Sequence, residues 1–226
     1  MVSARRVLLF DVNETLLDMA ALDPLFVRVF GDAGVRREWF AAMLGSALLF
    51  TVTGPYVEFG SHFRTALRLT AERRGATLRS EDEQAILGGV RTLPAHPDVR
   101  PALERLRAAG FRTAALTNSA PAVEEAQLAN AGIRDLFEIA LSADDAKRLK
   151  PAREAYEAAA KRMGVPVSQT RLVAAHAWDV AGALRAGAAA AFVARPGMQW
   201  NPLVERPDVW GADLHEVAEQ ILERDA

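Results

Sequence analysis

The sequence predicts an α/β protein, in which a parallel sheet is covered by helices on both faces and an all-helical insert follows the first strand. From about residue 98 onward, short apolar runs alternate with helical patterns, which is typical of parallel sheets. One more apolar run, Val7–Phe10, stands alone near the start of the chain. Between these two parts, the chain shows helical spacing without such runs. The insert therefore interrupts a single parallel α/β unit.

Strands are expected at the apolar runs, which are about four or five residues long and are bounded by polar or turn residues. Runs of this kind fit strands that are buried on both faces. In chain order the expected strands are Val7–Phe10, Thr113–Leu116, Phe137–Leu141, Leu172–Ala175 and Ala190–Val193.

Helices in the second part of the chain begin with Pro and end just before Gly, which suit the first turn and the left-handed C-cap of a helix. The segments run from Pro101 to Gly110, from Pro121 to Gly132 and from Pro151 to Gly164. A last amphipathic helix is expected from the apolar positions Leu214, Val217, Ala218, Ile221 and Leu222.

The insert is interpreted as consecutive helices around Leu22–Phe30, Glu38–Val52, Tyr56–Arg74 and Glu81–Val90. An insert at the C-terminal end of a strand lies over the crevice in which α/β proteins bind ligands. We therefore divide the chain into a core, residues 1–16 and 94–226, and a helical cap, residues 17–93.

Composition excludes several classes of protein. The chain has 226 residues, of which 50% are hydrophobic and none is Cys, and its formal net charge is −2. These values exclude a disordered chain, a disulfide scaffold, a thiolate-bound metal and a Cys nucleophile. They provide no basic field for nucleic acid, and no apolar run is long enough for a signal-peptide core or a membrane span. We expect a cytoplasmic protein that acts on a small molecule and binds neither nucleic acid nor a membrane.

Polar side chains follow the ends of the expected strands, and these ends meet at one crevice in a doubly wound sheet. They are Asp11, Thr15, Thr117, Asn118, Ser119, Lys150 and Asp179. Each of them alone is commonly a helix cap, a turn residue or a solvated boundary. Together they suit covalent catalysis by an aspartate: one carboxylate attacks, the ammonium keeps it ionised, and the second carboxylate activates water.

The order of these residues resembles the haloacid dehalogenase (HAD) superfamily, over essentially the whole chain. The similar motifs are Asp-x-x-x-Thr from Asp11 to Thr15, then Thr117 with Asn118, Lys150 with Pro151, and Trp178 with Asp179. Within the superfamily, the sequence most resembles the type II 2-haloacid dehalogenases. This resemblance implies a Rossmann-like core, a helical cap domain and, in many members, a homodimer.

The resemblance also implies a two-step hydrolysis. Asp11 would attack the halogen-bearing carbon of a short 2-haloacid, and Lys150 would keep Asp11 ionised. Asp179 would orient the water that opens the Asp11 ester. Thr15 and Thr117 would donate hydrogen bonds to Asp11 or to the substrate carboxylate.

Two further residues are assigned to the substrate site. Asn118 would help to hold the departing halide. Tyr156, which follows Lys150 by six residues, either donates a hydrogen bond within the site or only packs its helix against the core.

No metal or other cofactor is expected. HAD phosphatases carry a second Asp two residues after the nucleophile, where this chain has Asn13, which cannot donate an acid proton. They also bind Mg²⁺ through acidic residues of the fourth motif, where Ala175 removes one ligand. The insert contains no Lys, which argues against the Schiff base of phosphonate-cleaving relatives. A phosphatase that tolerates Asn13 and uses Mg²⁺ is one alternative, and a HAD-fold binding protein with little turnover is another.

Three parts of the chain depart from the type II pattern and put the substrate in question. Phe40 stands where the resemblance implies an Arg that grips the substrate carboxylate or the halide; an uncharged ring cannot replace a guanidinium. Arg36 and Arg37, one turn earlier, either replace it or form a solvated helix face. Glu14, in place of Gly, would repel an anionic substrate unless it points away.

The third departure is His176, which follows Ala174 and Ala175 where Ser-Ser-Asn is usual. An imidazole titrates near neutral pH, so His176 is either a base that activates water or a structural hydrogen-bond donor. The catalytic residues thus match the pattern, whereas the residues that would recognise the substrate differ from it.

Overall fold

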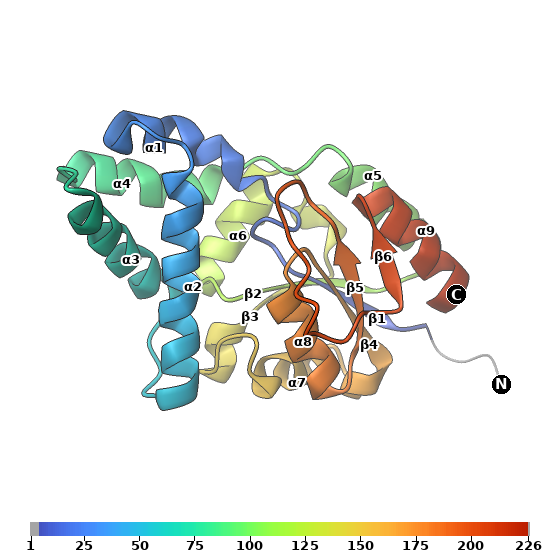
Figure 1. The fold of residues 1–226 in the computed structure, drawn as a ribbon. Helices are drawn as coiled ribbons and strands as arrows, with labels where there is room; N and C mark the ends of the chain where they lie inside the picture. Colours follow the sequence, from blue (N-terminus) through green and yellow to red (C-terminus); the bar gives the residue numbers. More distant parts are fainter. Residues whose placement is uncertain (1–4, 226) are drawn as a thin grey trace.

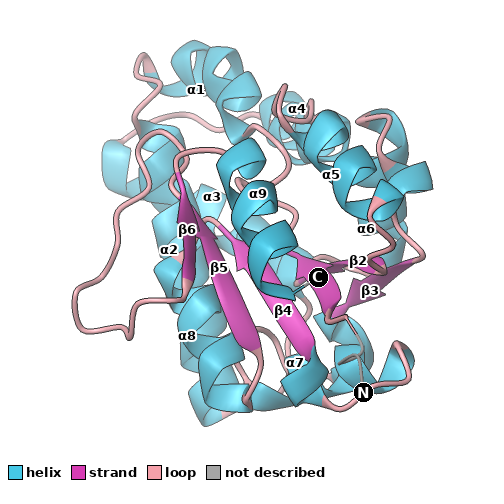
Figure 2. Cartoon of the chain, turned by 90° about the vertical axis from the view of Figure 1, so that its right-hand side faces the viewer, coloured by secondary structure: helices cyan, strands magenta, loops and turns pink. Residues whose placement is uncertain are grey.

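The computed structural model describes residues 5–225, which contain a parallel sheet of six strands in the order β3-β2-β1-β4-β5-β6 (Figure 2). The strands are β1 (Val7–Phe10), β2 (Thr113–Thr117), β3 (Ile139–Ser142), β4 (Thr170–Ala174), β5 (Ala189–Val193) and β6 (Val209–Gly211). The first strand of the chain lies at the centre, and the order reverses there. Ligands of doubly wound sheets bind at such a reversal.

The prediction of a parallel α/β sheet is confirmed, and each expected strand is present with ends shifted by at most two residues. The sequence analysis missed β6, because its three residues, Val-Trp-Gly, are too few for a recognisable apolar run. It also placed the start of the first core helix too late, since α5 begins at Val99 and contains Pro101 in its first turn.

Helices cover both faces of the sheet because successive residues of a strand point to opposite faces. Leu8 and Phe10 of β1 belong to the core under α5 (Val99–Ala108), α6 (Pro121–Asn130) and α9 (Leu214–Asp225). Val7 and Leu9 belong to the core on the other face, under α7 (Arg153–Arg162) and α8 (Ala177–Ala186). Figure 1 shows these helices on the two sides of the sheet.

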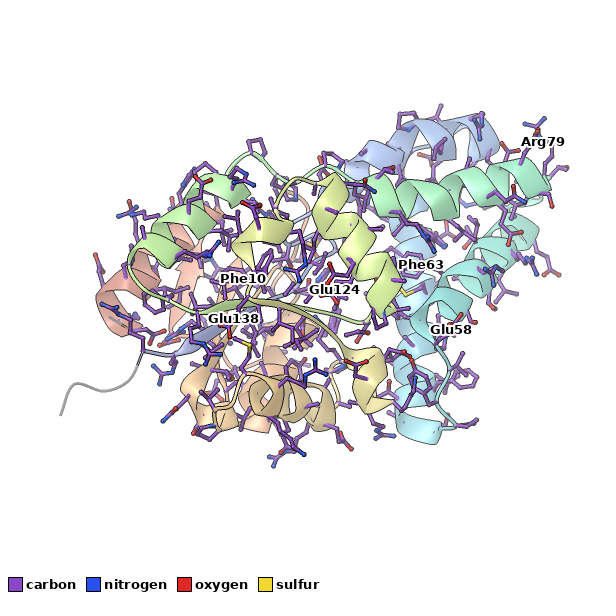
Figure 3. The ribbon with its side chains drawn as sticks, turned by 180° about the vertical axis from the view of Figure 1, so that it is seen from behind. Phe10, Glu58, Phe63, Arg79, Glu124 and Glu138 are labelled. Carbon is purple, nitrogen blue, oxygen red and sulfur yellow. The ribbon has the colours of Figure 1, made fainter. Side chains whose placement is uncertain are left out.

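The insert contains α1 (Asp23–Phe30), α2 (Val35–Thr53), α3 (Phe59–Arg74) and α4 (Ser80–Gly89), which stand beside the sheet (Figure 1). Trp39 of α2 is fully buried between Phe26 and Phe63, and its indole N–H donates to the Phe63 carbonyl (3.0 Å). This aromatic cluster, of which Figure 3 labels Phe63, holds α1, α2 and α3 together. The division into residues 17–93 and the remainder stays a prediction. Within residues 5–225, no helix combines the length and the apolar character needed to cross a membrane.

Candidate active site

Lys150 lies between two buried carboxylates. Its ammonium donates hydrogen bonds to Asp11 Oδ1 (2.8 Å), to Asp179 Oδ2 (2.6 Å) and to the Leu116 carbonyl (2.8 Å). The side chains of Lys150, Asp11 and Asp179 are 1%, 7% and 0% exposed. Asp11 follows β1, Lys150 precedes α7 and Asp179 lies in the first turn of α8, so three distant segments meet in one centre.

The charges of this centre fix the ionisation of Asp11. Burial alone would raise the pKa of Asp11, but Lys150 and His176 hold this pKa well below its usual range. Burial alone would lower the pKa of Lys150, but the two carboxylates raise it. Burial raises the pKa of Asp179, and the charge of Asp11 adds to this effect. Asp11 is therefore a carboxylate at neutral pH, the form that a nucleophile requires.

Thr15 and Thr117 position the loops that follow β1 and β2. The Thr15 hydroxyl donates to Asp11 Oδ2 (2.6 Å) and accepts from the backbone N–H of Ala175 (2.9 Å), so it links the nucleophile to the end of β4. The Thr117 hydroxyl accepts from the backbone N–H of Ser119 (3.2 Å). Thr15 thus touches Asp11 directly, whereas Thr117 shapes the neighbouring loop.

The Asn118 side chain binds the backbone of Lys150. Its Oδ1 accepts from the Lys150 N–H (2.7 Å), and its Nδ2 donates to the Lys150 carbonyl (3.2 Å). Both bonds fix the residue that carries the ammonium. The role of Asn118 toward a halide stays a prediction.

Tyr156 contributes both a hydrogen bond and packing. Its hydroxyl donates to Asp179 Oδ1 (2.5 Å), and the residue is fully buried between α7 and α8. Both oxygens of Asp179 are therefore occupied, one by Tyr156 and the other by Lys150. Burial, together with the adjacent Asp179 carboxylate, raises the pKa of Tyr156, so the phenol keeps its proton and donates it in a hydrogen bond.

Gly182 of α8 leaves the space that the Tyr156 hydroxyl fills. A Cβ at this position would collide with that hydroxyl and would lie 2.6 Å from Cβ of Pro151 and 2.8 Å from its carbonyl oxygen. We expect Gly182→Ala to lower the free energy of unfolding by about 1–3 kcal/mol, because overpacking displaces both neighbours. Denaturant unfolding would measure this effect.

The matched control is Gly88→Ala in α4, where no atom lies within 4 Å of the added Cβ. The free energy of unfolding of this variant is expected to rise by about 1 kcal/mol, since Ala has a higher helix propensity than Gly. Equal unfolding free energies for the two variants would contradict close packing around Tyr156.

Asn13 is directed toward α6. Its Oδ1 accepts from Gln127 Nε2 (2.8 Å), and its Nδ2 lies 3.5 Å from the Ser119 hydroxyl. An amide held in this way has no acidic proton to donate to a leaving group. Position 13 therefore offers no substitute for the acid of a phosphatase.

Glu14, His176 and Arg36 form a chain of opposite charges beside Asp11. His176 Nε2 lies 2.9 Å from Glu14 Oε2, and Arg36 Nη1 lies 3.4 Å from Glu14 Oε1. Arg36 also donates to Asp23 Oδ1 (2.5 Å). The charge of Glu14 is therefore compensated by two neighbouring cations.

His176 is protonated at neutral pH. Burial alone would lower its pKa, but the carboxylates of Asp11 and Glu14 raise the pKa to about 9. An imidazolium is a hydrogen-bond donor and not a base, so this geometry favours the donor interpretation. The Phe40 ring stacks on the imidazole, with centroids 5.9 Å apart.

Sequence reasoning missed two polar residues near the site. Arg195 donates to the Thr15 carbonyl (3.0 Å) and is paired with Asp98 (2.7 Å). Glu124 extends from α6 into the interior (Figure 3), where burial raises its pKa to about 8. A carboxylate in the first turn of a helix is usually solvated, so the sequence gives no sign that Glu124, three residues after Pro121, is buried.

Among residues 5–225, no cluster of three His, Cys, Asp or Glu side chains has the arrangement of a metal site. At the centre itself, Lys150 occupies the space between Asp11 and Asp179. An ammonium bridging two carboxylates competes with a cation for the same oxygens. These donors do not fit a bound Mg²⁺ in the arrangement described.

The fold and the centre together define a doubly wound α/β protein with a helical insert and a buried carboxylate held by Lys. The chain belongs to the haloacid dehalogenase-like hydrolases, since the model of that family matches residues 6–187. A curated relative, (S)-2-haloacid dehalogenase 2 of Pseudomonas sp. (strain CBS-3), is 31% identical, and the match covers 90% of each chain.

Solved structures agree with this assignment. An L-2-haloacid dehalogenase is 26% identical, with a TM-score of 0.91 over 97% of this chain and 99% of the other. A dehalogenase described with an intermediate complex is also 26% identical, with a TM-score of 0.88 over 96% and 97% of the two chains. The resemblance is confirmed, and the chain is a hydrolase of the 2-haloacid dehalogenase type.

Proposed function

We propose that the protein hydrolyses the carbon–halogen bond of a short 2-haloacid through an ester on Asp11. The observation that carries this proposal is the bridge of Lys150 between Asp11 and Asp179. It keeps the attacking carboxylate ionised within a buried site and places a second carboxylate beside it. The (S)-2-haloacid dehalogenase relative supports the substrate class.

In the first step, a carboxylate oxygen of Asp11 attacks C2 of the substrate from the side opposite the halogen. The new O–C2 bond forms as the C2–halogen bond breaks, and the halide leaves with the electron pair. Halide needs no proton in order to leave, which is consistent with an amide at Asn13. Thr15 and Lys150 orient the attacking carboxylate through their hydrogen bonds.

In the second step, water attacks Cγ of the Asp11 ester. The bond between Cγ and the ester oxygen breaks, and the leaving oxygen takes the other proton of this water, so the 2-hydroxy acid leaves and the Asp11 carboxylate is restored. Asp179 orients this water and accepts its proton, while Tyr156 and Lys150 fix the position of Asp179. The proton then passes to solvent, and the net reaction consumes one water and yields the hydroxy acid, halide and a proton.

Positive charge near the site supports an anionic substrate. A cavity of about 230 Å³ is lined by residues of both the insert and the core, including Glu14, Arg36, Arg37 and Arg195. Arg36 and Arg195 are paired with carboxylates, so Arg37, for which no ion pair is found within residues 5–225, is the lining cation that would attract an anion. We propose it as the route by which the substrate reaches Asp11.

The proposal also includes a cytoplasmic homodimer that works without a metal and binds neither nucleic acid nor a membrane. The absence of Cys is consistent with a reducing compartment, and the net charge of −2 with a small-molecule substrate. The pairing of the Lys150 ammonium with Asp11 and Asp179, the oxygens that a cation would need, supports metal independence. Exposed Leu49 and Val52 on α2 are compatible with a subunit contact.

The test is halide release from a panel of 2-chloro, 2-bromo and fluoro acids, with and without EDTA. We expect release that EDTA does not reduce, because Lys150 provides the positive charge at the centre. Turnover of phosphate esters that requires Mg²⁺, without halide release, would favour the phosphatase alternative. Ligand binding without turnover of either class would favour the binding-protein alternative.

A further inference from the structure

Two of the residues that depart from the type II pattern, Glu14 and Phe40, both contact a third, His176. The His176 ring stacks on Phe40 at an interplanar angle of 25°, and it also lies against Trp178, with centroids 5.4 Å apart. Its Nε2 is held by Glu14 at 2.9 Å. Three substitutions that are distant in the sequence therefore form one structural unit around an imidazole.

The backbone of Glu14 has an unfavourable conformation, which indicates that this unit has a functional role. Glu14 has φ +63°, in the left-handed region that favours Gly over residues with a Cβ. Such strain persists where the surroundings over-determine a conformation, and it is concentrated at functional sites. Here the strained residue delivers a carboxylate to His176 and Arg36.

One ring nitrogen of His176 is paired with Asp11 by charge but forms no hydrogen bond. Nδ1 lies 3.5 Å from Asp11 Oδ2 but forms no hydrogen bond, and the residue is 8% exposed. Because both ring nitrogens face carboxylate oxygens, which accept hydrogen bonds and do not donate them, Nδ1 carries an N–H. A buried N–H without a hydrogen bond is costly, so a group that accepts from it on binding gains free energy.

Two carboxylates are the charged groups that face His176. The carboxylates of Asp11 and Glu14 face its ring nitrogens, while α2 and α8 present the uncharged rings of Phe40 and Trp178. Lys150 and Arg36 act one step away, because they are paired with Asp11 and Glu14. The unit thus holds one imidazolium beside the nucleophile.

The position of Nδ1 selects the part of the substrate that it binds. In an in-line displacement, the halogen lies on the far side of C2 from the attacking oxygen. A donor beside that oxygen therefore faces the substituents that flank C2, and one of these is the carboxylate.

We propose that His176, held by Glu14, binds the carboxylate of the substrate through Nδ1 and so provides the positive charge that Phe40 lacks. This inference rests on the proposed function for the identity of the substrate. His176 touches the substrate in this arrangement, and Glu14 is a positioning residue that acts through it.

The kinetic test compares a 2-haloacid with the corresponding neutral 2-haloamide. For His176→Asn we expect KM for the acid to rise about 10- to 100-fold, the loss of a charge-assisted hydrogen bond. KM for the amide should hardly change. A fall in kcat for both substrates, without a change in either KM, would contradict the inference.

The pH profile gives a second readout that a merely structural role would not move. For the wild type, kcat/KM for the acid should fall as the pH rises through about 9, where His176 loses its proton. In Glu14→Gln this limb should move to lower pH, because one of the two carboxylates that raise the pKa is gone. If kcat/KM falls at the same pH in the wild type and in Glu14→Gln, the role of His176 is overturned.

Folding and turnover are separated by two controls. His62→Asn removes another buried imidazole, one that is hydrogen-bonded to Ser46 in the insert, and should leave both KM values unchanged. Calorimetric binding of propionate, which carries no halogen, tests the carboxylate site without any reaction. Binding that is about 10- to 100-fold weaker in His176→Asn supports the inference even if no halide is released, whereas equal binding overturns it.

Discussion

Replacement of Asp11 by Asn is expected to reduce halide release by about 10⁴-fold or more, the usual scale for loss of a covalent nucleophile. An amide oxygen is a poor nucleophile, and the neighbouring Asp179 is not placed to take over the attack. Asp179 is fully buried, and both of its oxygens accept hydrogen bonds from Tyr156 and Lys150. Initial rates of halide release by the purified variant would measure the effect.

The Asn side chain has nearly the volume of Asp and retains an oxygen that accepts from Thr15 or Lys150. We therefore expect the variant to fold, with unchanged circular dichroism. Halide release within about tenfold of the wild-type rate, well short of the loss expected for a nucleophile, would show that Asp11 is not the attacking group.

Replacement of Lys150 by Met is expected to have the second largest effect, on both stability and activity. It leaves Asp11 and Asp179 buried together without a cation, which costs about 3–5 kcal/mol when one partner of a buried pair is removed. The protein relieves this cost by protonating one carboxylate, because both pKa values rise without the ammonium. A protonated Asp11 cannot attack, so kcat should fall about 10²- to 10³-fold.

Lys161→Met is the matched control, because Lys161 is exposed on α7. Surface substitutions of this kind usually change stability by less than about 0.5 kcal/mol. Urea unfolding and halide release should therefore distinguish the two variants clearly. Equal stability of both variants would contradict the buried arrangement of Asp11, Lys150 and Asp179.

The fold was predictable because its signals are local. Each long strand is an apolar run, and most core helices carry Pro near the start or Gly beyond the end. A parallel sheet then brings the strand ends together, so Asp11, Thr15, Lys150 and Asp179 were expected in one place, and the structure places them there. The edge strand β6 was missed because its three residues are too few to show a hydrophobic pattern.

The hydrogen-bond partners of the residues around the nucleophile were not predictable, because they depend on side-chain directions. Glu14 was expected near the nucleophile, but its pairing with His176 and Arg36 depends on a left-handed backbone that the sequence does not reveal. In the same way, the amide of Asn118 is directed to the backbone of Lys150, a contact between residues 32 positions apart.

Capture of a single turnover in water labelled with heavy oxygen tests the central claim most directly. With the enzyme in excess over a 2-haloacid, water attacks Cγ of the ester, so the heavy oxygen should appear in the Asp11 carboxylate. Mass spectrometry of the peptide that contains Asp11 would detect it, and the 2-hydroxy acid should be unlabelled. Heavy oxygen in the hydroxy acid and none in the peptide would mean that water displaces the halide directly, which would contradict an ester on Asp11.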